Sequence, residues 1–344
     1  MQVAEFDFPF DPTLIASEPI LPRDQARLLV LSPSHHSHQS MMHRRVADLP
    51  YLLTPGDLIV VNDTKVLPVR LSGRKQPAGK PVDILFVREV AERLWEVLIK
   101  GRLRPGQRID LGSDGGVVVQ SRDNVRTVVR LDCPMSPREF FARWGMMPLP
   151  PYINRQPDNM DREWYQTVFA QEEGAIAAPT AGLHFTPELL ARLNQAGVGV
   201  ARVTLHVGIG TFKPVTADHV EDHRMGSEWF EVGPETVQAI EHAKERGGRV
   251  VAVGTTVVRA LETAASRQDG LRPERGETSL FITPGFSFRV VDALMTNFHL
   301  PKTTLLMLVS AFAGTSLLRR AYDEAVRERY RFYSYGDAML ILKP

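Results

Sequence analysis

The feature that most constrains the fold of this chain is a change, along the sequence, in the spacing of its apolar residues. Between Val66 and Leu131, short runs rich in Val, Ile, Leu and Arg alternate with proline and glycine turns, and no long helical pattern interrupts them. Short strands at this spacing are typical of a small antiparallel sheet or barrel. The six runs span 66–71, 82–87, 94–99, 108–111, 117–120 and 125–131.

After the proline-rich segment at 147–152, strand patterns alternate with helix patterns. Thr186 and Pro187 carry the signals of a helix start, and Gly197 can close that helix in a left-handed conformation. Alternation of this kind predicts an α/β domain with parallel strand pairing. The expected elements are a helix from 186 to 197, a strand at 203–207, a helix from 233 to 248, a strand at 250–253 and a helix from 257.

The segment before Val66 ends in an apolar strand of its own, Leu58-Ile59-Val60-Val61. The simplest interpretation is therefore an α/β main domain built from both ends of the chain, 1–66 and 148–344. A small six-stranded antiparallel β-barrel is inserted between them at 67–147. The length of 344 residues agrees with two domains of about 150 residues each.

Composition places the chain among ordinary soluble globular proteins, with 43% apolar and 24% charged residues. Apolar stretches stay well below the ~18 residues of a membrane span. The first residues lack the positive charge of a secretory signal, so we expect a cytoplasmic protein. The single cysteine, Cys133, cannot form an internal disulfide and has no second thiol for a metal site.

The distribution of charge is uneven along the chain. The whole chain carries a net charge of +1, which gives no footprint of nucleic-acid binding. From Arg70 to Asp110, however, there are ten basic and five acidic residues, a local surplus of five positive charges. This surplus marks the barrel as a candidate nucleic-acid contact, and the alternative is a solvated barrel exterior.

Five polar segments follow apolar strands or lie in glycine turns, where α/β sheets bind ligands. The first offers an amide, a carboxylate, a hydroxyl and a cation after the strand at 58–61, although Asn and Asp also favour plain turns. The second precedes a helix start, whose free N–H groups suit an anion. The candidate residues of these two segments are Asn62, Asp63, Thr64, Lys65, Thr180, Gly182 and His184.

The remaining three segments lie further along the chain. His206 is either a reactive group or an ordinary strand histidine, and Gly254-Thr255-Thr256 could form an anion or ribose cradle without a phosphate-loop signature. Thr303 is the expected N-cap of the apolar helix that follows the fifth segment and that Gly314 closes. The candidate residues here are His206, Gly208, Thr211, Thr255, Thr256, Arg259, Asn297 and His299.

Two histidine groups resemble metal sites. The histidines at 35, 36, 38 and 43 have no acidic or thiol residue interleaved with them. His219 and His223 lie four residues apart beside acidic residues, but the order typical of zinc proteases is absent. We therefore predict no metal site.

Eight stretches of the chain, in order between Pro9 and Ile341, are similar to the signature stretches of the S-adenosylmethionine:tRNA ribosyltransferase-isomerase family. The resemblance covers nearly the whole chain and keeps the order of the family. The stretches are GDLIVVNDTKVLPVRL, PLPPYINR, DREWYQTVFA, APTAGLHFT, VTLHVGIGTFKPV, AVGTTVVRALE, TNFHLPKTTLLMLVSAF and YRFYSYGDAMLI.

This resemblance implies an enzyme of queuosine biosynthesis. Such an enzyme moves the ribosyl part of S-adenosylmethionine onto 7-aminomethyl-7-deazaguanine in the tRNA anticodon, forms epoxyqueuosine, and releases adenine and methionine. S-adenosylmethionine is then a substrate, and no true cofactor is expected. The resemblance also implies an α/β domain with an inserted six-stranded barrel, and we expect a monomer. Gly226 replaces a family histidine, while His223 and Glu228 remain candidates.

The chemistry implied by the resemblance suggests roles for the candidates. A base must remove a proton beside the sulfonium, and an acid must assist the departure of adenine, so groups with pKa values near neutrality are required. We predict His184 and His206 for proton transfer, and Asp63 and Glu228 as base or counter-charge to the sulfonium. The other candidates would bind substrate, and the helix start after His184 would face a carboxylate.

Two other functions remain open at this point. A conventional S-adenosylmethionine-dependent RNA methyltransferase would carry a glycine-rich first loop and an acidic residue about 20 positions later, and no segment clearly supplies both. A non-catalytic RNA-binding protein would account for the barrel but leaves the polar strand ends unexplained.

Overall fold

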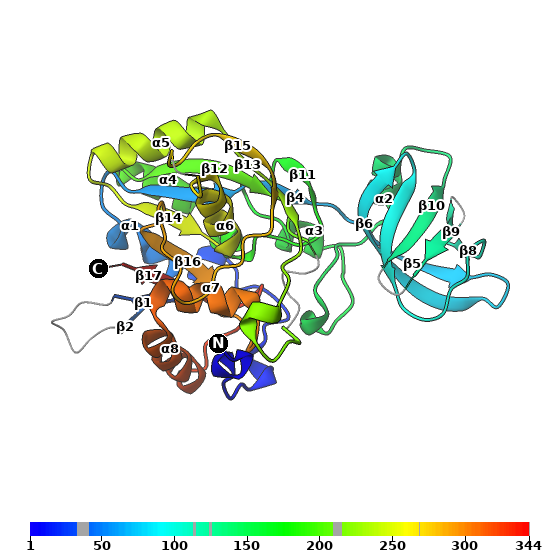
Figure 1. The fold of residues 1–344 in the computed structure, drawn as a ribbon, viewed down its shortest axis with the longest axis horizontal. Helices are drawn as coiled ribbons and strands as arrows, with labels where there is room; N and C mark the ends of the chain where they lie inside the picture. The colour runs from blue at the N-terminus through cyan, green and yellow to red at the C-terminus, as the bar shows by residue number, and fades with distance from the viewer. Residues whose placement is uncertain (33–40, 113–114, 124–125, 209–214, 268, 344) are drawn as a thin grey trace. The chain divides into compact units, whose positions relative to one another are not determined.

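The apolar run at 58–61 forms strand β3 (Leu58–Asn62), which lies inside a nine-stranded sheet of the computed structural model (Figure 1). Its residues are all buried, as expected for a strand covered on both faces. β3 pairs in parallel with β12 (Gly199–Leu205) and β14 (Val250–Val253), and β14 pairs in parallel with β16 (Ala293–Asn297). The structure describes residues 1–32, 41–112, 115–123, 126–208, 215–267 and 269–343.

Further strands extend the sheet on both sides of these four parallel strands. The order is β15-β13-β12-β3-β14-β16-β17-β1-β2. β17 is antiparallel to β16 and parallel to β1, so both ends of the chain share one sheet, as predicted. The added strands are β1 (Arg27–Leu31), β2 (Met41–Arg45), β13 (Glu228–Val232), β15 (Glu274–Thr278) and β17 (Ala338–Leu342).

Helices cover both faces of the sheet. Leu58 and Val60 contact a core that includes α5 to α8, while Ile59 and Val61 point the other way, toward α1 and α4. Among the described residues, every helix is too short or too polar to span a bilayer. The bounds are α1 (Leu49–Leu52), α4 (Pro187–Gln195), α5 (Pro234–Glu245), α6 (Thr255–Ala264), α7 (Thr304–Ala313) and α8 (Thr315–Arg327).

Short 3-10 helices connect these elements. They are η1 (Val3–Phe6), η2 (Pro12–Leu14), η3 (Arg23–Gln25), η4 (Val46–Asp48), η5 (Pro151–Ile153), η6 (Thr180–His184) and η8 (Val220–Asp222). Of these, η6 contains three of the residues that the sequence marks as candidates.

The helix bounds follow the sequence signals where a side chain caps the helix. Thr186 Oγ1 accepts the N–H of Leu189 at 3.1 Å to begin α4, and Gly197, with φ of 76°, follows its end, as predicted. Thr303 likewise caps α7, and Gly314 ends it, as predicted.

Two expected bounds were wrong. β12 begins at Gly199, four residues before the expected strand, because its parallel pairing with β3 starts there. α6 begins at Thr255 rather than Val257, because Gly254 at φ of 94° turns the chain into the helix without a side-chain cap.

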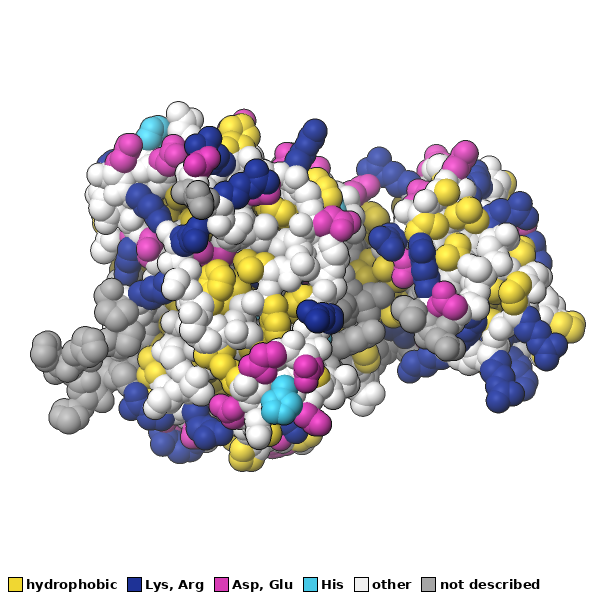
Figure 2. Space-filling model, viewed as in Figure 1, with side chains coloured by type: hydrophobic (Ala, Val, Ile, Leu, Met, Phe, Trp, Pro, Cys, Tyr) yellow, Lys and Arg dark blue, Asp and Glu magenta, His cyan; other side chains and the backbone are white. Residues whose placement is uncertain are grey.

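The predicted inserted barrel is confirmed as a closed, antiparallel sheet in the order β10-β7-β6-β5-β8-β9. Trp95 and Val97 point into its core, whereas Leu98 is exposed. Figure 2 shows Lys and Arg side chains over the visible face of this unit. Its strands are β5 (Arg70–Lys75), β6 (Lys80–Ala91), β7 (Leu94–Ile99), β8 (Arg108–Asp110), β9 (Gly116–Arg122) and β10 (Thr127–Asp132).

The first expected barrel run, 66–71, is divided between two strands. Thr64–Val66 forms β4, which pairs with β11 (Glu172–Ala175) in a separate two-stranded sheet. The barrel itself begins only at Arg70, after Pro68. A proline cannot donate to a strand ladder, which gives a physical reason for the break.

The chain divides into two compact units, which we compare with the domains expected from sequence. The first comprises Met1–Lys65, Pro150–Arg155 and Gln166–Pro344, and the second comprises Val66–Leu149 and Gln156–Tyr165. The difference lies at 156–165, which the sequence assigned to the α/β domain. Arg162 in α3 (Asp161–Trp164) donates to the Gly145 carbonyl at 2.7 Å, just after α2 (Pro137–Trp144), and so ties this segment to the second unit.

Candidate functional site

The candidate residues gather where the parallel strands end. Because β12, β3, β14 and β16 run in the same direction, their carboxyl ends share one edge of the sheet. The segments that follow these four strands carry the polar residues singled out in the sequence. The residues at or just after the strand ends are Asn62, Asp63, Thr64, His206, Gly208, Thr255, Thr256, Asn297 and His299.

A cleft with about 320 Å³ of empty space opens at this edge. It lies between the start of α6, the segment before and within η6, and the residues after β16. Among the residues that the structure describes, its lining contains no Asp, Glu, Lys or Arg. Hydroxyl groups and one imidazole provide its polar side chains. The lining comprises Ala178, Pro179, Thr180, Ala181, Val207, Gly254, Thr255, Thr256, Thr296, His299 and Leu305.

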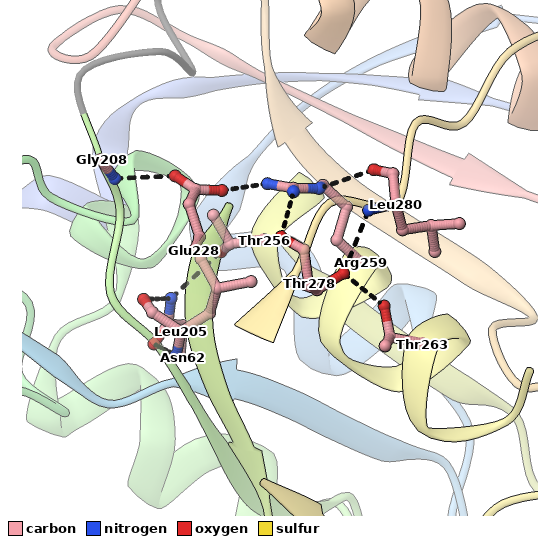
Figure 3. A network of polar contacts seen from close by, with 9 residues as sticks. All are labelled: Asn62, Leu205, Gly208, Glu228, Thr256, Arg259, Thr263, Thr278 and Leu280. Atoms are coloured by element: carbon pink, nitrogen blue, oxygen red, sulfur yellow. Dashed lines mark hydrogen bonds and ion pairs between the residues drawn. The ribbon is translucent and has the colours of Figure 1, made fainter. Parts of the chain in front are cut away.

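A first polar cluster lies at the ends of β3 and β12. The Asn62 amide nitrogen donates to the Leu205 carbonyl at 2.9 Å and to Thr256 Oγ1 at 3.2 Å. Its amide oxygen accepts the N–H groups of Leu205 and Thr64, both at 3.1 Å. Asn62 thus uses its whole amide to join two strands to the first turn of α6, and Figure 3 shows its contacts with Leu205 and Thr256.

His206 belongs to the same cluster. A hydrogen bond of 2.8 Å joins its Nδ1 to Thr64 Oγ1, and its ring stacks on Trp229 with centroids 5.0 Å apart. Gly174 approaches so closely that a Cβ there would lie 2.6 Å from Nε2. Burial lowers the pKa of His206, against a smaller opposite effect of Glu172, so the imidazole is neutral at neutral pH.

Asp63 is a buried carboxylate beside this cluster. It accepts a hydrogen bond from Thr204 Oγ1 at 2.7 Å. Burial is the largest influence and raises its pKa, while the Thr204 hydroxyl opposes the rise. A carboxyl group whose pKa moves toward neutrality is suited to proton transfer.

A second polar cluster surrounds Asn297 at the end of β16. Its amide nitrogen lies 3.2 Å from His184 Nε2 and donates to the Tyr333 carbonyl at 3.0 Å. Its amide oxygen accepts from Thr180 Oγ1 at 3.0 Å. Burial, with smaller effects of two nearby arginines, lowers the pKa of His184 to about 3, so this histidine is neutral at pH 7.

The cleft lies between the two clusters. Thr256 lines the cleft and also bonds to Asn62 in the first cluster. Thr180 lines the cleft and bonds to Asn297 in the second. A ligand in the cleft would therefore contact residues that are hydrogen-bonded to both clusters.

A buried ion pair supports the start of β13 from α6. Figure 3 shows the Arg259 guanidinium directed at the Glu228 carboxylate, and both side chains are nearly inaccessible to solvent. Arg259 also donates to the carbonyls of Leu280 at 3.0 Å and Thr278 at 3.4 Å. The second carboxylate oxygen of Glu228 accepts the Gly208 N–H at 2.7 Å, which ties down the chain just after β12.

His299 combines burial with an unused ring nitrogen. Its backbone N–H donates to the Tyr322 hydroxyl at 2.8 Å, but its Nδ1 is buried and has no hydrogen-bond partner within the described ranges. Burial lowers the pKa of this imidazole to about 3. A buried polar atom without a partner indicates a place where a ligand or water can bind.

Lys65, Gly182 and His223 are predicted binding residues that neither line the cleft nor belong to the two polar clusters or the buried ion pair. Lys65 pairs with Glu173 at 3.1 Å, and Gly182 packs against Thr167, where a Cβ would meet the methyl carbon at 3.1 Å. His223 lines a separate surface hollow with Met1 and Phe281, and burial lowers its pKa. Thr211 lies outside the described residues.

Of the two histidine groups that resemble metal sites, the structure describes His43, His219 and His223. Within the described parts of the chain, no group of three His, Cys, Asp or Glu side chains could hold a metal ion. The histidines at 35, 36 and 38 are outside those parts.

Sequence reasoning assigned no role to three residues that contact the candidate site. Trp229 on β13 stacks on His206, Thr204 bonds to Asp63, and Tyr333 supplies the carbonyl that fixes Asn297. Two signals were available: Thr204 and Tyr333 lie in stretches, at 203–215 and 330–341, that carried part of the family resemblance, but neither residue received a role.

Comparisons with known proteins identify the family of the chain. A family model described as "Queuosine biosynthesis protein" matches residues 3–341. The chain is similar to S-adenosylmethionine:tRNA ribosyltransferase-isomerases of Halothermothrix orenii (47% identical, 99% of this chain and 100% of the relative) and Acidiphilium cryptum (49% identical, 99% of each). A solved S-adenosylmethionine tRNA ribosyltransferase of Thermotoga maritima is similar in structure, with a TM-score of 0.56, 39% identity, and coverage of 98% of this chain and 100% of that one.

Proposed function

The chain belongs to the queuosine biosynthesis protein family and is an enzyme of the transferase-isomerase class, and we propose that it acts on S-adenosylmethionine and tRNA. In this proposal it transfers and isomerises the ribosyl moiety of S-adenosylmethionine onto 7-aminomethyl-7-deazaguanine in the tRNA, giving epoxyqueuosine-tRNA, adenine and methionine. The observation that supports it best is the uncharged polar cleft between two clusters that each contain a neutral histidine. We propose a monomer, because one chain supplies both clusters.

The first step requires a base near the sulfonium. The positive sulfur acidifies the adjacent C5′ protons of the ribose, and a neutral imidazole can remove one of them. We propose His206 for this role. Thr64 engages its Nδ1, Trp229 fixes the plane of its ring, and Nε2 would accept the proton.

The later steps need groups that hold protons and position adenine. Burial raises the pKa of Asp63, so this group can take up a proton more readily than an exposed aspartate. We propose that it serves as the acid or as the counter-charge to the sulfonium. His184, which Asn297 orients, remains our second proton-transfer candidate. Its low pKa makes it a weak base that stays neutral, so we propose that it relays a proton through its ring rather than holding one.

Glu228 has a different proposed role. Its two oxygens are already engaged by Arg259 and by the Gly208 N–H. We therefore propose that its fixed negative charge holds the segment after β12 in place and contributes to the counter-charge for the sulfonium.

A product assay tests the proposed function. The protein is incubated with labelled S-adenosylmethionine and tRNA that carries 7-aminomethyl-7-deazaguanine. We expect adenine and methionine to be released together, and only with this tRNA. Release of S-adenosylhomocysteine would instead identify a methyltransferase, and tRNA binding without any product would identify a non-catalytic RNA-binding protein.

Replacement of His206 with alanine should lower the rate of adenine release by ~10² or more, since loss of a general base has effects of that size. The measurement is kcat for adenine release, with the thermal unfolding midpoint recorded to confirm folding. The matched control is His242→Ala, because His242 is an exposed histidine near the end of α5. A His206→Ala variant with near-normal turnover would remove this histidine from the mechanism.

The barrel is our proposed tRNA contact. Arg102 and Arg104 are exposed, and no carboxylate within the described ranges forms an ion pair with them. Replacing both with alanine should raise KM for tRNA about tenfold and reduce the slope of log KM against log salt by about 1–2. KM for S-adenosylmethionine should stay unchanged.

The control for this surface is a double alanine variant of Arg319 and Arg320, two exposed arginines on α8. If both double variants changed KM for tRNA equally, the effect would reflect total charge, and the barrel would not be a specific contact.

A further inference from the structure

The start of helix α6 is a buried helix end without a protein cap. Gly254, Thr255 and Thr256 line the cleft, and Gly254 has no side chain that could accept the first helical N–H groups. Within the described residues, no acceptor meets the backbone N–H groups of Thr255, Thr256 or Val257. The free N–H groups of the first turn, with Thr255 and Thr256 in the lining, and the positive end of the helix dipole therefore lie at the cleft.

A second and independent observation points to the same ligand chemistry. His299 lines the cleft from the other side, after β16, and is only 6% exposed. Its buried Nδ1 has no partner in the described parts of the chain. As a neutral imidazole it can present an N–H at this atom, and so act as one more donor.

The lining also limits which anion can bind. Proteins hold nucleic-acid phosphates mainly with Lys and Arg, and neither occurs among the described residues of the lining. Helix N–H groups with hydroxyls are suited to a small anionic group of a bound substrate. Of the two substrates in the proposed reaction, S-adenosylmethionine has one anionic group, the carboxylate of its amino-acid part.

We propose that this cleft binds the carboxylate of S-adenosylmethionine, with the N–H groups at the start of α6 and Nδ1 of His299 as donors. The inference rests on the proposed function, and it moves the carboxylate from the start of α4, where the sequence suggested it, to the start of α6. The amino-acid part is then anchored beside Thr256, whose hydroxyl bonds to Asn62 in the cluster that contains His206.

The direct test compares two ligands in a binding measurement that needs no turnover. Labelled S-adenosylmethionine and its decarboxylated analogue, which lacks only the carboxylate, are titrated into the wild-type protein by equilibrium dialysis. We expect the analogue to bind 10-fold to 100-fold more weakly. Equal affinities, or no binding of either ligand, would overturn the inference. Failure of the product assay alone, with the ligand preference intact, would count against the proposed reaction and not against this site.

A variant that supplies its own carboxylate gives a second test. Thr255→Asp is nearly isosteric and places a negative group in the first turn of α6, where it complements the helix dipole. Affinity for S-adenosylmethionine should fall at least tenfold, affinity for the decarboxylated analogue should hold or improve, and the unfolding midpoint should not drop. An equal loss for both ligands, or no loss for either, would contradict the assignment.

Helix α8 offers a matched control. It also begins with a glycine of positive φ followed by threonine, Gly314-Thr315, but this start is exposed and lies outside the cleft. Thr315→Asp should leave both affinities unchanged. At His299, replacement by leucine should reduce the preference for the carboxylate ligand, and replacement by asparagine, whose amide can donate from a similar position, should restore most of it.

Discussion

Replacement of Arg259 with methionine is expected to lower the free energy of unfolding by about 3–5 kcal/mol, the usual cost of breaking a buried ion pair by removing one partner. Arg259 is 3% exposed and is the only cation paired with Glu228 among the described residues. Its loss would also remove the guanidinium hydrogen bonds to the carbonyls of Leu280 and Thr278. Urea unfolding followed by circular dichroism measures the change.

The exposed pair of Arg267 and Glu274 is the control, since its Arg267 side chain is 72% exposed and the two groups are 3.0 Å apart. Arg267→Met should cost less than about 1 kcal/mol. A double variant, Arg259→Met with Glu228→Leu, should recover part of the lost stability because no lone charge remains. Equal losses for Arg259→Met and Arg267→Met would show that the buried ion pair contributes no more to the free energy of unfolding than the exposed pair.

Acidification from pH 6 to pH 4 is expected to remove about 5 kcal/mol of stability through two buried histidines. In the folded protein, burial lowers the pKa values of His184 and His299 to about 3, against 6.5 for an unperturbed histidine. Both stay neutral when folded but take up protons when unfolded below pH 6.5. Their contribution is therefore fully present above pH 6.5 and is lost as the pH falls toward 3.

Other groups act in the opposite sense in this pH range. Burial raises the pKa values of Asp63 and Asp337, so protonation at low pH relieves an unfavourable buried charge and offsets part of the loss. The two histidines are isolated by comparing pH dependences rather than absolute stabilities. Between pH 6.5 and pH 3, each of the two histidines lowers the free energy of unfolding by about 1.4 kcal/mol for every pH unit of acidification.

The measurement is the urea midpoint of unfolding at several pH values between 4 and 7. A double variant, His184→Gln with His299→Gln, should show a clearly shallower pH dependence than the wild type. The exposed residue His242 provides the control, and His242→Gln should keep the wild-type slope. An unchanged slope in the double variant would mean that these two histidines do not control acid stability.

Much of the fold could be predicted because its signals are local. The start of α4 depends on Thr186 and Pro187, and its end on Gly197, all within a dozen residues of chain. The barrel strands could be predicted from the proline and glycine turns between short apolar runs. The start of α6 was misplaced because Gly254 provides conformation but no capping side chain, so the sequence contains no cap signal there.

That the candidate residues gather at one edge of the sheet could also be predicted, but their contacts with one another could not. Polar residues after apolar parallel strands must meet at one edge of the sheet, which located Asn62, Asn297 and their neighbours. That Asn62 uses its whole amide within the protein, or that Trp229 stacks on His206, depends on strand register. His206 and Trp229 are 23 positions apart, and Asn297 and Tyr333 are 36 apart. Contacts over such separations produce no periodic pattern in the sequence.

The place of β17 in the sheet has a consequence for the order of folding during synthesis. β17 lies between β16 and β1, and it pairs with a strand made more than 300 residues earlier. The β1–β2 hairpin must therefore wait for almost the entire chain before it can join the sheet, with one strand edge unpaired. The barrel strands, all between Arg70 and Asp132, form local pairs and can close while the ribosome is still producing the rest of the α/β unit.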